Sequence, residues 1–451
     1  MTRFIAWMVL VVVIGYGVMS HSRSSANAIC DTGECVVGGF AAAVLRKNNP
    51  YHGAAFYINP EYVRNVNDSI AKTPAHKTAM GKVRAHPTAV WLDRIATIEG
   101  SARSMGIEAH LNEALAQQAN GTEPSKPMLV TFVVYNLPNR DCAAFASNGE
   151  LTLKADGLEK YKTNYIDEIV KRFTAKPAYK KLRIVVIVEP DSIPNAITNV
   201  SSDYPRCIES VGAYQEGVKY AVSKLGAVDN VYLYLDIAHS GWLGWAHTAR
   251  ATQFYKDLLT PHGNLGKIRG FAANVANYSA LKENDPYLDV NKNQSIIANF
   301  YEGNRMIDES TYVAVWKSAF PEKGIIIDTS RNGWRPTADG PPIEKRAHRG
   351  NWCNVSEAGI GERPKASPAP GIDAYVWVKP PGESDGTSDT SATSPNDEGK
   401  RFDRMCGTAA TTRPYSKGRA IATNALGGAP HAGHWFHDQF VMLVNNATPP
   451  L

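Results

Sequence analysis

Residues 183–195, RIVVIVEPDSIPN, begin as a run of β-branched residues and then change abruptly to Glu189, Pro190 and Asp191. An apolar run such as Ile184 to Val188 is typical of a central parallel strand that is covered on both faces. A carboxylate at the end of such a strand is unfavourable unless it has a partner, or unless a raised pKa serves a purpose. The stretch therefore predicts either a structural pair or a reactive acid at the end of a buried strand.

The alternation of strand and helix extends along the chain. Apolar residues at helical spacing predict helices over residues 158–173 and 211–225. Strands alternating with helices indicate βαβ units and a parallel sheet, which is either closed into a barrel or open with helices on both faces. In addition to residues 183–188, strand-like runs are expected at residues 128–135, 231–235, 270–275, 324–327 and 374–378.

Polar residues follow the carboxyl ends of these expected strands. In a parallel α/β barrel those ends open on one face, where such proteins place their chemistry. Any one of the acids could instead be a helix N-cap or part of a loop salt bridge, but six strand ends that behave alike favour a shared site. The residues are Asp141, Glu189, Asp191, Asp236, His239, Asn277, Asp328, Lys379, Glu383 and Asp385.

Composition sets wide limits on the kind of protein. The chain has 451 residues, of which 43% are hydrophobic and 20% charged, so it is an ordinary folded protein with one large domain or two smaller ones. The formal net charge of +5 includes Arg3 and Arg23 of the first 28 residues, which carry no acid. So small an excess does not indicate a nucleic-acid partner.

The N-terminus has the pattern of a targeting segment. Arg3 precedes an apolar run over residues 4–19, and Ala26-Asn27-Ala28 is a small-x-small motif that a signal peptidase accepts. We expect residues 1–28 to be a signal peptide, the protein to be secreted and extracellular without membrane association after cleavage, and residues 29–451 to form a single catalytic domain. An uncleaved anchor is the alternative, although the run is short for a membrane span of ~20 residues.

Six cysteines remain after the expected cleavage. An even number in an exported chain predicts disulfides, and no pair has the spacing of metal ligands. Free buried thiols are the alternative. Cys30 and Cys35 are close enough to close a small loop, whereas the residues alone leave the other pairings open: the six are Cys30, Cys35, Cys142, Cys207, Cys353 and Cys406.

The acids and aromatic residues together suit glycoside hydrolysis. That reaction needs one protonated carboxyl that donates to the leaving oxygen, and a carboxylate environment on the other side of the sugar that accepts a proton from water. Trp242, Trp245, Trp352 and Tyr57 offer flat faces on which sugar rings can lie. Tryptophans are often core residues, but Trp242 and Trp245 lie among glycines beyond a strand end, which favours a binding role.

Two metal-site interpretations are rejected. Residues 385–398 have acids at a spacing similar to a calcium loop, but Thr390 stands where that loop requires glycine. His431, His434 and His437 recur every third residue beside aromatic residues, which indicates a packed segment. We therefore expect no metal and no cofactor.

Six strings mark the strand ends and the loops that follow them. They are VVYNLPNRDCAAFASNGE (133–150), VIVEPDSI (186–193), YLDIAHSGWLGW (234–245), GFAANVANY (270–278), GNWCN (350–354) and VWVKPPGESDGTSD (376–389). In this order they resemble glycoside hydrolase family 6, a family of cellulases, from about Asn49 to the C-terminus. The resemblance implies a distorted, incomplete parallel (β/α) barrel, with loops that enclose a substrate tunnel or cleft at the C-terminal ends of the strands, and hydrolysis of a β-1,4-glucan with inversion of the anomeric carbon.

The resemblance also implies catalytic roles. Asp191 matches the proton donor, and Asp141 matches the neighbour whose charge raises the donor's pKa and keeps it protonated. Asp385 matches the acid that is proposed as base, although a water chain held by Ser147 and backbone carbonyls is an alternative route for the proton.

Further positions match groups that surround the sugar. Tyr135 is expected to crowd the ring at the cleavage point and Arg140 to orient the acids. Tyr57 stands near the position where fungal members carry a tryptophan platform, and Asp236 and His239 match binding residues below the cleft. The expected substrate-binding set is Tyr57, Asp236, His239, Trp242, Trp245, Asn277, Trp352, Lys379 and Glu383.

The family's disulfides would join Cys142 to Cys207 and Cys353 to Cys406, each closing a loop over the cleft. The long polar stretch between Asp385 and Trp435, which contains Cys406, suits a lid, with a disordered surface insertion as the alternative. A lid favours attack from a chain end, so we expect a monomeric cellobiohydrolase that releases cellobiose from the non-reducing ends of cellulose and cello-oligosaccharides. The alternatives are an endo-β-1,4-glucanase of the same family and a non-catalytic carbohydrate-binding protein. No Pro/Thr/Ser-rich linker is found, so we expect no separate carbohydrate-binding module.

Overall fold

Strand β4 (Arg183–Val188) forms where the apolar run predicts it. The computed structural model describes residues 48–451 apart from 102–103, 246, 284–293, 336–342, 393–398, 410 and 413–419. Successive side chains of β4 enter two apolar clusters, with Ile184 and Val186 in one and Val185 and Ile187 in the other. Both faces of the strand are buried, because helices cover one side of the sheet and the other side curls onto itself.

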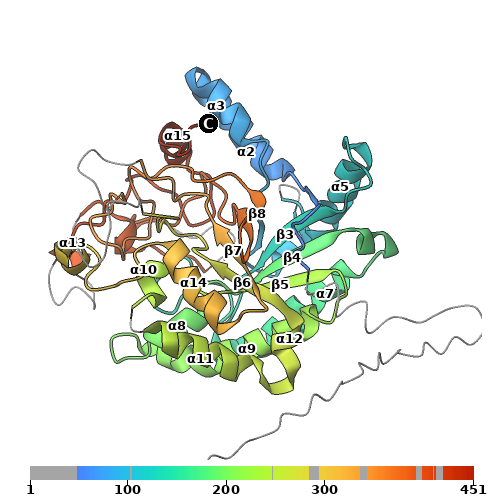
Figure 1. The fold of residues 1–451 in the computed structure, drawn as a ribbon, viewed down its shortest axis with the longest axis horizontal. Coiled ribbons are helices and arrows are strands. Elements are labelled where there is room, and N and C mark those ends of the chain that lie inside the picture. Colours follow the sequence, from blue (N-terminus) through green and yellow to red (C-terminus); the bar gives the residue numbers. More distant parts are fainter. Residues whose placement is uncertain are drawn as a thin grey trace, which may run out of the picture. The chain divides into compact units, whose positions relative to one another are not determined.

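The main sheet has β4 near its middle. Its strand order is β1-β3-β4-β5-β6-β7-β9-β8, with β2 beside β3 (Figure 1). Strands β1 to β7 and β9 pair in parallel, whereas β8 pairs antiparallel with β9. The described strands β1 and β8 end this order without closing it, which confirms the predicted distorted, incomplete barrel. The bounds are β1 Ala55–Phe56, β2 Val90–Leu92, β3 Met128–Val134, β5 Val231–Asp236, β6 Ile268–Ala273, β7 Gly324–Asp328, β8 Lys365–Ala369 and β9 Ile372–Val376, and a separate pair is β10 Thr411–Thr412 with β11 Ala420–Ile421.

Helices lie against the outer face of the sheet. The long helix α9 (Pro205–Leu225) packs on β4 and β5, and α8, α9, α11 and α12 lie together along one side in Figure 1. The other bounds are α2 Pro60–Lys72, α3 Lys77–Val83, α4 Ala96–Glu99, α5 Ile107–Asn120, α6 Gly157–Lys160, α7 Asp167–Phe173, α8 Ser192–Thr198, α10 Ser240–Leu243, α11 His247–Leu259, α12 Asn264–Lys267, α13 Gln294–Asn299, α14 Glu309–Ala319 and α15 His437–Asn445.

Both predicted helices are present with altered bounds. The helix expected over residues 158–173 consists of α6, a π-helical segment (Tyr161–Ile166) and α7. The helix expected from residue 211 already begins at Pro205, because proline fits the first turn of a helix. Strand β9 ends two residues earlier than expected, since the N–H of Val378 donates to the carboxylate of Asp328 at 3.3 Å.

Residues 44–451 form one compact unit. Disulfides join Cys142 to Cys207 and Cys353 to Cys406, which confirms the two pairings implied by the resemblance. The expected pair Cys30 and Cys35, like the expected signal peptide, lies outside the described residues. Across the part of the chain that the structure describes, no helix combines the length and apolar character that a membrane span requires.

Candidate active site

A cavity of about 1210 Å³ opens at the carboxyl ends of the strands. The turns after β3, β4, β5, β6 and β9 all contribute to its lining, as expected for a parallel barrel. The structure thus brings together most of the site residues predicted from sequence, namely Tyr135, Arg140, Asp141, Ser147, Asp191, His239, Trp242, Trp245, Asn277, Trp352, Lys379, Glu383 and Asp385.

The two acids that end β4 have different roles. Glu189 is buried, and its two carboxyl oxygens accept hydrogen bonds from the N–H groups of Asn136 and Leu137 at 3.1 and 3.2 Å, which ties the end of β4 to the end of β3. Asp191 lies two residues later at the start of α8 and lines the cavity. Glu189 therefore has a structural role, and Asp191 is the candidate reactive acid.

Asp191 is surrounded by conditions that keep it protonated. Burial raises the pKa of its carboxyl well above the ordinary value, and the nearby charges of Asp141 and Asp236 raise it further. The sequence-based interpretation assigned this effect to Asp141, so burial is an additional and larger cause.

Hydrogen-bond donors and positive charges surround the carboxyl group of Asp141. The Tyr135 hydroxyl donates to its Oδ2 at 2.5 Å, and Ser147 and the guanidinium groups of Arg140 and Arg206 also favour its charged form. Burial nevertheless raises the pKa of Asp141. When the pair shares one proton, these donors place the charge on Asp141 and the proton on Asp191.

The backbone at these acids is strained. Asp141, Glu189 and Asp191 have φ angles of 51°, 48° and 64°, which is the left-handed region that L-residues rarely adopt. Such conformations persist where the surrounding structure imposes them, and they cluster at active sites. The strain therefore supports a functional role for this cluster of acids.

Asp236 lies beneath the cavity and does not line it. Its Oδ2 accepts a hydrogen bond from the N–H of Asp191 at 2.9 Å, and burial raises its pKa to about 7. The prediction that Asp236 binds substrate is corrected here, because this carboxyl instead holds the backbone of the candidate proton donor.

Asp385, the predicted base, is occupied by other donors. Its oxygens accept hydrogen bonds from Arg331 Nη1 at 2.8 Å, from the Tyr278 hydroxyl at 2.6 Å and from the N–H of Asn354 at 2.8 Å. The side chain of Arg331 has no exposed area, so the two charges compensate each other. These contacts indicate a structural role for the Asp385 carboxylate in the cavity wall.

Arg140 donates hydrogen bonds to the loop that carries Asp141, and its charge also favours the ionised form of that acid. Its guanidinium donates to backbone carbonyls of Asp93, Tyr135, Ser147 and Asn148, and it lies over the Tyr135 ring at 4.2 Å. The predicted orienting role is thus exerted through the backbone that carries Asp141.

Aromatic side chains lie along the cavity, with one correction. Trp242, Trp245 and Trp352 line it and are partly exposed. Tyr57 does not line it: the ring is only 1% exposed, and its hydroxyl forms a hydrogen bond of 2.8 Å with His110 Nδ1. Tyr57 is thus a core residue, because its hydroxyl is satisfied inside the molecule.

The missed aromatic residue is Trp91. It lies on the short strand β2, lines the cavity, packs edge-on against Tyr135 and has the Lys379 ammonium 5.5 Å from its ring centre. Its indole N–H donates to the carbonyl of Val378 at 2.9 Å, which fixes the ring. Its position within a short apolar run, VWL, that is followed by Asp93 is the signal that could have identified it.

Lys379 and Glu383 form a weak pair in the same wall. Their charged atoms are 3.9 Å apart, and burial raises the pKa of Glu383 to about 7 and lowers that of Lys379. Both groups can hydrogen-bond a sugar hydroxyl in either protonation state.

Two loops meet at the cavity and form a roof, which we define as residues 141–150 together with the described residues 385–392 and 399–406. The Phe145 N–H donates to Asp403 at 2.8 Å, the Arg401 N–H donates to the Phe145 carbonyl at 3.2 Å, and the Arg401 guanidinium lies 4.4 Å from the centre of the Phe145 ring. Part of the predicted lid, including residues 393–398 and 413–419, lies outside the described residues.

The chain is similar to known proteins over most of its length. The family described as "Glycosyl hydrolases family 6" matches residues 51–447. Exoglucanase A of Cellulomonas fimi is 43% identical, over 91% of this chain and 49% of its own length, so the chain spans about half of that relative. Probable 1,4-beta-D-glucan cellobiohydrolase C of Aspergillus niger is 36% identical, over 89% of this chain and 78% of that protein.

Solved structures give the same result. The catalytic domain of Cellulomonas fimi Cel6B has a TM-score of 0.81 and 41% identity, over 89% of this chain and 96% of that one. Cellobiohydrolase II (Cel6A) from Humicola insolens, in complex with glucose and cellotetraose, has a TM-score of 0.73 and 32% identity, over 90% and 100%.

Proposed function

The chain belongs to glycosyl hydrolases family 6, and we propose that it is a cellobiohydrolase that cleaves β-1,4-glucosidic bonds of cellulose and cello-oligosaccharides with inversion. The observation that carries this proposal is the pair Asp141 and Asp191 in one cavity, where the pKa of Asp191 is raised and Asp141 accepts a hydrogen bond from the Tyr135 hydroxyl. Tryptophan faces along the same cavity supply the surfaces on which glucose rings lie.

Asp191 is the general acid. It donates its proton to the glycosidic oxygen as the bond to the anomeric carbon breaks, and the leaving sugar takes that proton as its new hydroxyl. Asp141 remains charged on the Tyr135 side and so opposes the ionisation of Asp191 until a better proton acceptor arrives.

Water attacks the anomeric carbon from the opposite side of the ring. Its proton leaves through Ser147 toward Asp141, because Ser147 interacts with that carboxylate and both line the cavity. We assign Asp385 to the cavity wall and not to this role, because its carboxylate pairs with the buried Arg331 at 2.8 Å. This assignment replaces the predicted base with the alternative proton route.

The roof favours attack from a chain end. The two loops contact each other at Phe145, and this contact supports a covered path in which threading from a chain end is the main route. We extend the proposal to release of cellobiose from non-reducing ends, to a secreted monomer with a signal peptide at residues 1–28, and to one catalytic domain in residues 29–451.

Replacement of the general acid tests the assignment. Asp191→Ala should abolish hydrolysis of cellotetraose while binding, measured by calorimetry, stays nearly intact. Equal turnover by the wild type and the variant would refute the role of Asp191.

The mode of attack needs a separate assay. Viscosity of a soluble cellulose derivative is followed together with reducing-sugar release. A steep fall in viscosity at little sugar release would mean endo cleavage and would remove the exo part of the proposal.

A further inference from the structure

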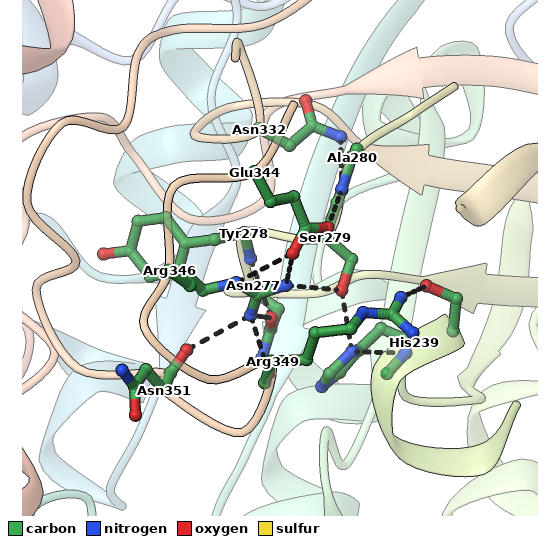
Figure 2. Close-up of polar contacts among 12 residues, drawn as sticks. His239, Asn277, Tyr278, Ser279, Ala280, Asn332, Glu344, Arg346, Arg349 and Asn351 are labelled. Carbon is green, nitrogen blue, oxygen red and sulfur yellow. Dashed lines mark hydrogen bonds and ion pairs between the residues drawn. The ribbon is translucent and has the colours of Figure 1, made fainter. Parts of the chain in front are cut away.

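A buried network of hydrogen-bonded polar side chains lies behind the cavity wall next to Trp242. Figure 2 shows it: the Glu344 carboxylate pairs with Arg346, whose guanidinium reaches Ser279, and the Ser279 hydroxyl reaches the imidazole of His239. Ser279, Glu344 and Arg346 are buried, whereas His239 lines the cavity and keeps 7% of its area exposed. The network therefore connects the buried ion pair of Glu344 and Arg346 to His239, which can contact substrate.

The directions of the hydrogen bonds follow from the chemistry of the donors. Arg346 Nη2 can only donate, and it donates to Ser279 Oγ at 3.3 Å, which leaves the hydroxyl hydrogen free to point at His239 Nδ1, 2.9 Å away. The N–H of Gly241 also donates to Nδ1, at 3.2 Å. Because two donors point at Nδ1, that nitrogen carries a lone pair and the proton is on Nε2.

The same surroundings keep the imidazole neutral. A proton on Nδ1 would face the Gly241 N–H, and the guanidinium groups of Arg346 and Arg349 lie nearby. Burial is the largest cause of the lowered pKa of His239, followed by these two charges. The acids of the region are engaged elsewhere, since Glu344 binds Arg346 and Glu309 accepts from the N–H of Ser240 at 2.8 Å.

The network also fixes the position of the cavity wall around His239. Arg346 donates to the side-chain oxygen of Asn277 at 3.3 Å and to the carbonyls of Arg349 and Asn351 at 3.0 and 3.1 Å. Asn277, Arg349 and the following Trp352 all line the cavity. One buried guanidinium thus fixes both a hydrogen-bonding amide and the loop that carries an aromatic face.

We propose that Arg346 and Ser279 are positioning residues that lock His239 as a neutral Nε2–H donor, aimed at a hydroxyl of the glucan unit beside Trp242. This inference rests on the proposed function for the identity of the ligand. Across the described residues, no hydrogen bond of His239 Nε2 is found, so this donor is available to a sugar oxygen.

A double-mutant cycle tests the relay. Ser279→Ala in the full-length protein should lower kcat/KM for cellotetraose roughly tenfold, the loss expected for one well-placed hydrogen bond. In a His239→Ala background the same change should have no further effect beyond roughly twofold. Ser310→Ala, which also removes a hydroxyl, bonded to the Leu281 carbonyl at 2.7 Å, is the matched control and should leave kcat/KM unchanged.

A measurement that needs no turnover separates this inference from the proposed function. Nitrogen-15 NMR of labelled protein, with the His239→Gln variant for assignment, should show the Nε2–H tautomer from about pH 5 to about pH 8. An Nδ1–H signal, titration within this range, or an equal effect of Ser279→Ala in both backgrounds would overturn the relay. An inactive wild type with the Nε2–H signal would instead refute the proposed function alone.

Discussion

Asp385→Asn distinguishes a structural carboxylate from a catalytic base. The wild-type carboxylate accepts four hydrogen bonds, of which two come from Arg331 Nη1 and the others from Tyr278 and Asn354. An asparagine has one acceptor oxygen, and its NH2 group would face donors. The substitution therefore leaves Arg331, whose side chain has no exposed area, without the carboxylate that pairs with it.

The expected cost follows from that burial. Removal of one partner of a buried pair lowers the free energy of unfolding by about 3–5 kcal/mol, which is a large share of the roughly 5–15 kcal/mol that holds an ordinary protein folded. Urea denaturation should show a fall of this size. Asp385→Asn combined with Arg331→Met removes both charges, and should recover most of the stability and of the cellotetraose hydrolysis.

A catalytic base would behave differently. Asp385→Ala would then be inactive although folded, added azide would restore hydrolysis, and the double variant would be stable but inactive. Unchanged stability of Asp385→Asn together with azide rescue of Asp385→Ala would refute the role assigned to Arg331 and Asp385.

Three further predictions concern the donor, the aromatic wall and the roof. Asp236→Asn keeps an acceptor for the Asp191 N–H but removes a charge that raises the pKa of Asp191. Because Asp191 works as an acid only when it is protonated, the alkaline limb of the kcat/KM profile should move to lower pH. A shift to higher pH would contradict this prediction. Tyr57→Phe should lower the free energy of unfolding by about 1–3 kcal/mol, because it leaves buried His110 without its hydrogen bond, and it should not change KM. Trp91→Ala should raise KM for cellotetraose roughly tenfold. The reverse pattern would restore Tyr57 as the platform. Cys406→Ser removes a disulfide that joins residues 53 positions apart. Thermal and urea unfolding should then show that the free energy of unfolding falls by about 4 kcal/mol, the loop-entropy contribution of such a bond. A fall below about 1 kcal/mol would show that the roof is ordered without the disulfide.

Long buried strands were predictable because their apolar patterns leave little choice. RIVVIV is typical of a strand covered on both sides, because it is short and rich in β-branched residues, and β4 begins and ends at the predicted residues. β1, with two residues, and β2, with three, carry no periodicity of their own, and they pair because β3 offers its edge. Trp91 was missed for this reason.

The site was predictable at the level of residue type but not of partner. Asp191 and Asp141 lie in one cavity as expected. The Arg331 partner of Asp385 is 54 residues away and the His110 partner of Tyr57 is 53 residues away. Such pairs depend on how loops fold back, so a sequence that shows each group does not show which of them are already satisfied.

The construction of the roof bears on how a polymer reaches the acids. Covalent links anchor each roof loop at its base, through Cys142 and Cys406, whereas the described contacts between the loops at Phe145 are two hydrogen bonds and a ring–guanidinium contact. A seam of this kind parts and reseals by local fluctuation while the barrel stays folded. With the proposed attack from chain ends, we expect side-on capture of an internal segment as a minor route, and we expect warming, which loosens the seam without breaking the disulfides, to increase its share.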